Sequence, residues 1–278
     1  MHKPTILYIV GLGHSGSTLL DLLLGSHTQA VGLGELGVLS SRSSEGSREL
    51  ALREQPCTCG TPSRLDCPFW GGVDRWLHEE HGTSLMKIAL DAPLRSDRVA
   101  ANRALYSTIS ELTGRRYLVD SSKSRSRLRS LIEAQFDVRP IHLVREPHGV
   151  VYSNVRKGRS WLHYSGHYAS STLKTHRLLA ARPHLLVRYE ELAAEPEAVV
   201  RRIVEWVGLE FEPGQLCWTE FEHHQLSGNR MRFSGDPSIR LDRSWQEGLS
   251  RSQRIAISAF TLPSRVIVRA PRRGNVHT

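Results

Sequence analysis

A glycine-rich turn near the start of the chain combines residue types that could hold an anion. The apolar run of residues 6–10 leads into Gly11-Leu-Gly-His-Ser-Gly16, and a helix is predicted over residues 17–25. In such a strand–loop–helix unit, backbone N–H groups converge at the helix N-terminus, where the helix dipole also favours negative charge. The sequence therefore predicts a phosphate-binding loop. Its expected binding residues are Gly13, His14, Ser15, Gly16, Ser17 and Thr18.

The loop departs at one position from the G-x-x-x-x-G-K-[ST] consensus of nucleotide triphosphate-binding proteins. Gly11, Gly16 and Thr18 match, but Ser17 occupies the lysine position. That lysine reaches the β- and γ-phosphates, so its absence argues against a kinase or NTPase. Asp120 ends an apolar run and could imitate the magnesium-holding aspartate, which keeps this class as an alternative.

A second candidate anion site follows another apolar run, residues 141–144. Arg145 comes directly after this predicted strand, at the end where open α/β sheets bind their ligands. Ser153 lies about two helical turns further on, so its hydroxyl could point back toward the same edge. A guanidinium and a hydroxyl together suit a phosphate monoester. Arg156 and Lys157 add positive charge one turn later.

Together, these two elements resemble those of sulfotransferases of the broad bacterial and Golgi type. Such enzymes use 3'-phosphoadenosine 5'-phosphosulfate (PAPS). Residues 11–20 resemble the family's 5'-phosphosulfate loop, and residues 141–153 resemble its 3'-phosphate element. Three further stretches, residues 119–123, residues 186–192 and the late loop (residues 224–242), extend the resemblance over most of residues 5–245. The resemblance implies transfer of a sulfonate from PAPS to a hydroxyl of an acceptor. It also implies release of adenosine 3',5'-bisphosphate (PAP) and no required metal.

The resemblance also suggests roles for individual residues. Tyr189, in an R-Y-E-x-L segment, is expected to contact the nucleotide, and Arg232 in the late loop could reach a phosphate. His14 stands where the family usually carries Lys or Arg, and it could act as an imidazolium or as a neutral donor. Lys123, beyond a predicted strand, could neutralise the bridging oxygen of the leaving nucleotide. Glu35 follows the second strand and is the candidate base for the acceptor hydroxyl.

Three of the four cysteines lie close together in the sequence. Cys57, Cys59 and Cys67 share a polar, Gly- and Pro-containing stretch. Such clustering in a cytosolic protein suggests a metal or reduced thiols before it suggests disulfides. A zinc site needs a fourth ligand. The candidates considered are His78, His81 and Cys217, and reduced loop thiols remain the alternative.

The pattern of apolar runs predicts the fold that must position these residues. Strands are expected at residues 6–10, 30–33, 117–119, 141–144 and 184–187, and helices at 17–25, 100–112, 124–134, 149–156, 172–181 and 195–207. Uninterrupted apolar strands alternating with helices predict a doubly wound, mainly parallel α/β sheet flanked by helices, with a P-loop-like topology.

The expected domain organisation is a single sulfotransferase domain over residues 1–262. Residues 40–98 interrupt the strand–helix rhythm and are interpreted as an insertion on the acceptor side. Residues 263–278 are expected to form a basic, flexible tail.

The composition restricts the class of partner without choosing one. The chain has 278 residues and a formal net charge of +9, which suits anionic ligands. No apolar stretch approaches a membrane span and no signal peptide is evident, so a cytoplasmic location is expected. No nucleic-acid motif is present, although a degenerate nucleotide- or nucleic-acid-binding protein remains an alternative. The expected partner is a hydroxylated acceptor: a small molecule, glycan, lipid or peptide.

Overall fold

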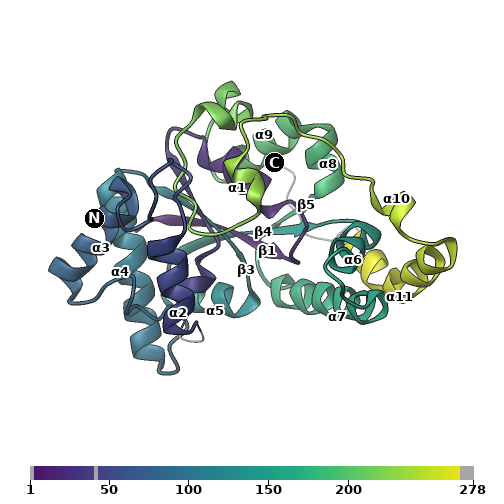
Figure 1. Cartoon of the computed structure of the whole chain (residues 1–278), viewed down its shortest axis with the longest axis horizontal. Coiled ribbons are helices and arrows are strands. Elements are labelled where there is room, and N and C mark those ends of the chain that lie inside the picture. The colour runs from purple at the N-terminus through teal and green to yellow at the C-terminus, as the bar shows by residue number, and fades with distance from the viewer. Residues whose placement is uncertain (1–2, 41–42, 270–278) are drawn as a thin grey trace.

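Five parallel strands form one sheet in the order β2-β3-β1-β4-β5 (Figure 1). The computed structural model describes residues 3–40 and 43–269. The strands are β1 (Thr5–Gly11), β2 (Ala30–Gly34), β3 (Tyr117–Lys123), β4 (Asp137–Val144) and β5 (Leu185–Arg188). All five predicted strands are confirmed, with ends that differ by a few residues.

Helices cover both faces of this sheet. They are α1 (Ser17–Gly25), α2 (Glu45–Glu49), α3 (Pro68–His81), α4 (Arg95–Thr113), α5 (Arg125–Glu133), α6 (Pro147–Val155), α7 (Trp161–Leu179), α8 (Tyr189–Ala194), α9 (Pro196–Trp206), α10 (Trp245–Gly248) and α11 (Arg251–Arg269). Residues of α1, α8 and α9 pack on one face, and residues of α4, α5 and α7 pack on the other. The predicted doubly wound α/β fold is confirmed.

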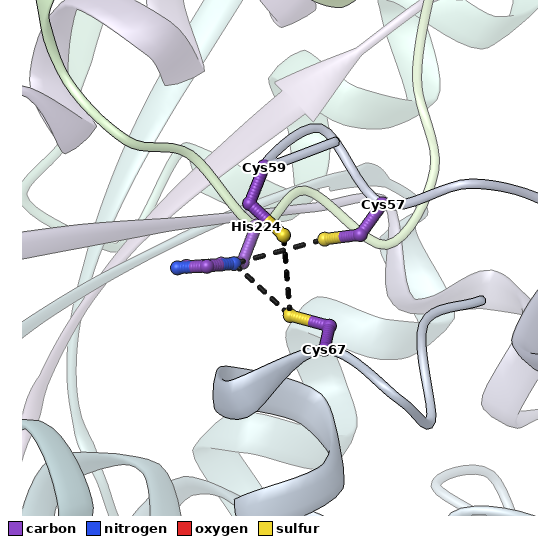
Figure 2. A group of neighbouring side chains, drawn as sticks. All are labelled: Cys57, Cys59, Cys67 and His224. Atoms are coloured by element: carbon purple, nitrogen blue, oxygen red, sulfur yellow. Dashed lines mark hydrogen bonds between the residues drawn. The ribbon is translucent and has the colours of Figure 1, made fainter. Parts of the chain in front are cut away.

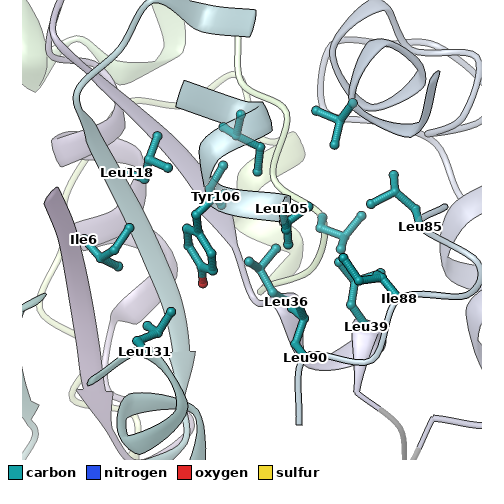
Figure 3. Packing of buried hydrophobic residues seen from close by; sticks show 14 of the residues in the cluster. Ile6, Leu36, Leu39, Leu85, Ile88, Leu90, Leu105, Tyr106, Leu118 and Leu131 are labelled. Atoms are coloured by element: carbon teal, nitrogen blue, oxygen red, sulfur yellow. The ribbon is translucent and has the colours of Figure 1, made fainter. Parts of the chain in front are cut away.

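Successive side chains of β1 point to opposite faces and so enter two separate cores. Ile6, Tyr8 and Val10 are buried with residues of α4 and α5, whereas Leu7 and Ile9 are buried with residues of α1 and α9. Burial on both faces explains why the strands are uninterrupted apolar runs. Figure 3 shows part of the first core, which includes Leu105 of α4 and Leu85, Ile88 and Leu90 of the insertion.

The insertion shares the core of the sheet domain. Leu52, Trp70, Val73 and Leu77 are fully buried in the cluster that contains the α4 and α5 leucines. Helix α3, which was not predicted, begins at Pro68, where a proline is tolerated because the first helical N–H needs no partner. Residues 40–98 therefore extend one domain.

The C-terminal boundary predicted at residue 262 is wrong as a structural limit. Helix α11 continues through Pro263 to Arg269 and packs against α6 and α7. Its buried Ile257, Thr261 and Ser264 explain why the helix continues past residue 262. The remaining residues of the predicted tail, 270–278, lie outside the described residues. Over the described part of the chain, no helix is both long and apolar enough to cross a bilayer.

Candidate active site at the carboxyl edge of the sheet

Each of the five strands leads at its carboxyl end into a group that lines one cavity. The loop of residues 12–16 follows β1, Glu35 follows β2, Lys123 ends β3, Arg145 follows β4 and Tyr189 follows β5. The cavity has a volume of about 930 Å³. Because parallel strands carry their ligand-binding loops at this edge, residues distant in the sequence meet here.

The glycine-rich loop presents the amino end of α1 to this cavity. Gly16 has a φ of 88°, and a Cβ at this position would lie 2.6 Å from the Tyr189 ring. No described side chain caps the first turn of α1, which leaves its N–H groups available to an anion. The predicted loop residues that line the cavity are Gly13, His14, Gly16, Ser17 and Thr18. Ser15 is buried and lines a smaller adjacent cavity.

Arg145 lies between the glycine-rich loop and Tyr189, the first residue after β5. Its Nη1 donates to the His14 carbonyl oxygen at 2.9 Å, and its guanidinium lies 4.4 Å from the centre of the Tyr189 ring. A Cβ at Gly149 would lie 2.6 Å from Arg145 Nε, so the glycine makes room for the guanidinium. Ser153 lines the same cavity, and its Oγ donates to the Gly149 carbonyl oxygen at 2.8 Å. The structure thus brings Arg145 and Ser153 to the same cavity, as the sequence predicts.

A carboxylate already pairs with this guanidinium. Arg145 Nη2 donates to Asp242 Oδ2 at 2.9 Å. Partial burial raises the pKa of Asp242, but hydrogen bonds from Ser244 and Arg145 outweigh that effect and bring the pKa to about 2. Asp242 therefore supplies a negative charge where a phosphate is predicted.

His14 lies among cations, which favours its neutral form. Lys157 Nζ lies 3.2 Å from His14 Nε2. Burial lowers the pKa of His14, and the nearby charges of Lys157, Arg145 and Lys123 lower it further. Of the two states considered for this histidine, the free protein favours the neutral donor. His14 also has a φ of 66°, and such left-handed non-glycine residues concentrate at functional sites.

Glu35 and Lys123 form an ion pair across neighbouring strands. Lys123 Nζ lies 2.5 Å from Glu35 Oε1, and both side chains line the cavity. The Glu35 backbone N–H donates to the Ser227 carbonyl oxygen at 3.0 Å. Lys123, like His14, is left-handed, with a φ of 63°, which turns the chain at the end of β3. A carboxylate and an ammonium thus lie together beside the glycine-rich loop.

The late loop closes one side of the cavity. The Asn229 N–H donates to Thr18 Oγ1 at 2.9 Å, which attaches the loop to the first turn of α1. The Arg232 guanidinium donates to the carbonyl oxygens of Gly228 and Asn229 and stacks on Phe233. Arg232 therefore supports its own loop and is absent from the residues that line the cavity.

Comparison with known proteins identifies the family. Residues 4–213 match the model that describes the sulfotransferase family. The chain belongs to the sulfotransferase family. No curated protein has significant sequence similarity to it.

Solved structures of sulfotransferases share the fold. The sulfotransferase domain of the Synechococcus PCC 7002 olefin synthase is 21% identical, with a TM-score of 0.59 and 98% of each chain covered. The sulfotransferase domain from the curacin biosynthetic pathway is 19% identical, with a TM-score of 0.54 over 93% of this chain and 98% of that one. A sulfotransferase from Alicyclobacillus acidocaldarius is 15% identical, with a TM-score of 0.50 over 96% and 95%.

The position of Asp120 does not favour the NTPase alternative for this sulfotransferase. Asp120 is fully buried, where it accepts hydrogen bonds from Tyr106 and from the Ser122 N–H. Arg127 Nη2 lies 3.5 Å from the same carboxylate and neutralises it. The carboxylate belongs to a structural network and does not line the cavity. The lysine position of the loop is Ser17, so neither requirement of that class is met.

Asp21 is a buried carboxylate of the sulfotransferase that was not predicted. It accepts hydrogen bonds from the Gly34 N–H at 3.1 Å and from Gln225 Nε2. Burial raises the pKa of Asp21 to about 7, although hydrogen bonds from Ser121, Gln225 and Gly34 oppose the shift. Asp21 thus joins α1 to Gly34, the residue before Glu35, and to Gln225 of the late loop. A lone carboxylate in the run Leu-Leu-Asp-Leu-Leu was the sequence signal for it.

The three clustered cysteines meet a histidine from the late loop (Figure 2). The Sγ atoms of Cys57, Cys59 and Cys67 and a ring nitrogen of His224 all lie within 4.8 Å of one another. The residues predicted as a possible fourth metal ligand, His78, His81 and Cys217, do not belong to this group. His78 and His81 lie near the cysteines in the sequence, whereas the fold brings in His224 from a loop beyond the last strand.

Proposed function

We propose that this sulfotransferase transfers a sulfonate from PAPS to a hydroxyl of an acceptor and releases PAP. The observation that carries the proposal is a single cavity with two kinds of group. The anion-binding groups are the uncapped N-terminus of α1 and Arg145. The groups for proton transfer and charge stabilisation are Glu35 and Lys123, which line the same cavity as an ion pair. Anion binding and proton transfer could therefore occur within one cavity.

The groups of the cavity match the two charged ends of the donor. The loop N–H groups and the hydroxyls of Ser17 and Thr18 would hold the 5'-phosphosulfate. Arg145 and Ser153 would hold the 3'-phosphate, with charge-assisted hydrogen bonds from the guanidinium. Tyr189 would pack beside the nucleotide, since its ring already braces Arg145 and Gly16. Arg232 would act indirectly, by shaping the late loop.

The transfer step would be an in-line displacement at sulfur. The acceptor oxygen forms a bond to sulfur while the bond from sulfur to the bridging oxygen of the donor breaks. Glu35 takes the acceptor proton, and Lys123 stabilises the negative charge that develops on the leaving PAP. His14, as a neutral donor, would hydrogen-bond to the transferred sulfonate. The step itself uses no metal in this proposal.

Calorimetric titration with PAP, 5'-AMP and ATP–magnesium tests the choice of nucleotide. We expect PAP to bind at least about 10-fold more tightly than 5'-AMP, because a charge-assisted phosphate contact contributes ~1.5–3 kcal/mol. Preference for ATP–magnesium would contradict the proposal and support the NTPase alternative. Binding of none of the three would favour a degenerate protein without turnover.

The variant Arg145→Ala tests which residue reads the 3'-phosphate. We expect the preference for PAP over 5'-AMP to disappear, while weak 5'-AMP binding remains. The matched control is Arg139→Ala, in the same strand β4, where the arginine is half-buried, pairs with Asp137 and does not line the cavity. The control should bind PAP like the unmodified protein. An unchanged PAP preference in Arg145→Ala would remove this residue from the proposed site.

A further inference from the structure

The three cysteines and His224 have the spacing of a single tetrahedral metal site. Cys59 Sγ lies 3.6 Å from Cys67 Sγ, and His224 Nδ1 lies 3.6 Å from Cys57 Sγ and 3.2 Å from Cys67 Sγ. Tetrahedral zinc with Zn–S bonds of about 2.3 Å separates its sulfur ligands by roughly 3.8 Å. The four ligand atoms are therefore already arranged around a common centre.

Hydrogen bonds and ring packing orient the histidine for this role. Glu222 Oε1 lies 3.0 Å from His224 Nε2, so Nε2–H faces the carboxylate and Nδ1 faces the thiols. Metal-bound histidines commonly have such a carboxylate on their second nitrogen, where it selects the tautomer. The Phe69 ring stacks on the imidazole with an interplanar angle of 2°. His224 is thus held in the orientation that a metal ligand requires.

A hydrogen-bonded turn and the start of a helix fix the backbone at the three cysteines. The Cys57 N–H donates to the Thr61 carbonyl oxygen at 2.9 Å, which closes a tight turn around Cys59. Gly60 adopts a φ of 96° in this turn. Cys67 immediately precedes α3, so the start of a regular helix fixes the position of its side chain. The turn and the helix start present their sulfur atoms to the same point.

We propose that Cys57, Cys59, Cys67 and His224 bind one Zn²⁺ ion as a structural site. Three thiolates and one imidazole in tetrahedral geometry are typical of structural zinc. Ligand atoms within 4.8 Å of one another leave room for one ion and exclude the larger spread of a multi-iron cluster. The thiols lose their protons on binding, and no redox step is involved.

The proposed ion would join the insertion to the late loop beside the cavity. Trp70 Nε1 donates to the His224 carbonyl oxygen, and the Gln225 N–H donates to Thr58 Oγ1. The next residue, Leu226, donates its N–H to the Leu33 carbonyl oxygen at 2.9 Å, at the end of β2. The zinc would thus fix the segment that leads to Ser227, which accepts the Glu35 N–H. It would lie away from the reacting atoms.

Metal analysis of the purified full chain tests the proposal directly. We expect about one equivalent of zinc per chain after gel filtration. Addition of Co²⁺ to protein stripped of metal should produce the visible absorption of tetrahedral thiolate-bound cobalt. This cobalt measurement uses the unmodified chain and does not depend on whether a variant folds.

Variants then identify the ligands. Cys67→Ser and His224→Ala should lose most of the zinc, whereas Cys217→Ser, at an exposed cysteine outside the group, should keep it. Glu222→Gln should weaken zinc affinity about 10-fold by removing the partner of Nε2, with exposed Glu220→Gln as the control.

Three results would overturn the proposal. The first is unmodified protein without zinc that also gives no thiolate–cobalt spectrum. The second is iron in place of zinc. The third is an intact mass lower by two hydrogens in freshly purified protein, because it would show a disulfide among these cysteines.

Discussion

Lys123 Nζ and Glu35 Oε1 lie 2.5 Å apart, so the candidate cation and the candidate base form an ion pair before any ligand is bound. Lys123 ends β3, and Glu35 directly follows β2. These two strands are adjacent in the sheet. In the proposed reaction, the Glu35–Lys123 ion pair therefore links removal of the acceptor proton to stabilisation of the negative charge on the leaving group. In the proposed reaction, Lys123 turns from the carboxylate toward the bridging oxygen as negative charge develops there.

Replacement of Glu35 should reduce turnover more than it reduces nucleotide binding. We expect Glu35→Gln to lower turnover by about 10²–10⁴-fold, the usual contribution of a general base. PAP affinity should change little, because the carboxylate does not contact the nucleotide in the proposal. PAP release from PAPS, with a hydroxylated compound that supports turnover of the unmodified protein, measures the loss. Glu79→Gln, at an exposed site on α3, is the control. Turnover close to normal in Glu35→Gln would eliminate it as the base.

Asp242 should compete with the 3'-phosphate for Arg145. Its pKa of about 2 keeps it ionised at neutral pH, so it repels a second anion at the guanidinium. We expect Asp242→Asn to tighten PAP binding about 5-fold, the effect of removing roughly 1 kcal/mol of charge repulsion in solvent. Calorimetric titration measures the change, and Asp97→Asn, at an exposed carboxylate of α4 that does not line the cavity, is the control. Weaker binding would instead mean that Asp242 positions Arg145 for the ligand.

Anion binding should raise the pKa of His14. Burial and the charges of Lys157, Arg145 and Lys123 lower this pKa in the free protein, and a bound anion would offset those charges. Binding therefore takes up a proton between the free and bound pKa values, so PAP affinity should increase as the pH falls. Titrations at about pH 6 and pH 8 in unmodified protein and in His14→Gln measure this effect. Equal pH dependence in the two proteins would argue against it, since the phosphate groups titrate identically in both.

The burial of Asp21 should make the fold less stable as the pH rises. Burial raises its folded pKa to about 7, above the ordinary value of 3.8, so its contribution is present in full below about 3.8. The contribution is lost as the pH rises through about 7, because the unfolded chain loses the proton earlier. We expect a loss on the order of a few kcal/mol over this range. Denaturant unfolding should show a shallower decline in Asp21→Asn and an unchanged one in Asp97→Asn, an exposed control. A steep decline in both variants would assign the pH effect elsewhere.

Sequence patterns were sufficient where the relevant information is local. Glycine spacing after an apolar run predicted the loop, because only a tight turn brings N–H groups together at the start of α1. Uninterrupted apolar strands predicted a parallel sheet, since a sheet buried on both faces excludes polar side chains. The ends of those strands predicted Glu35, Lys123 and Arg145 near one another, because parallel strands carry their carboxyl ends to the same edge.

Only the tertiary structure determined which side chains from distant segments contact one another. Asp242 reaches Arg145, and His224 reaches the cysteines, from a loop that follows the last strand, and no spacing in the sequence encodes those contacts. Arg232 was predicted to face a phosphate but lies against the carbonyls of its own loop. Local periodicity determines which elements form, whereas the packing of loops across the sheet edge determines which side chains meet.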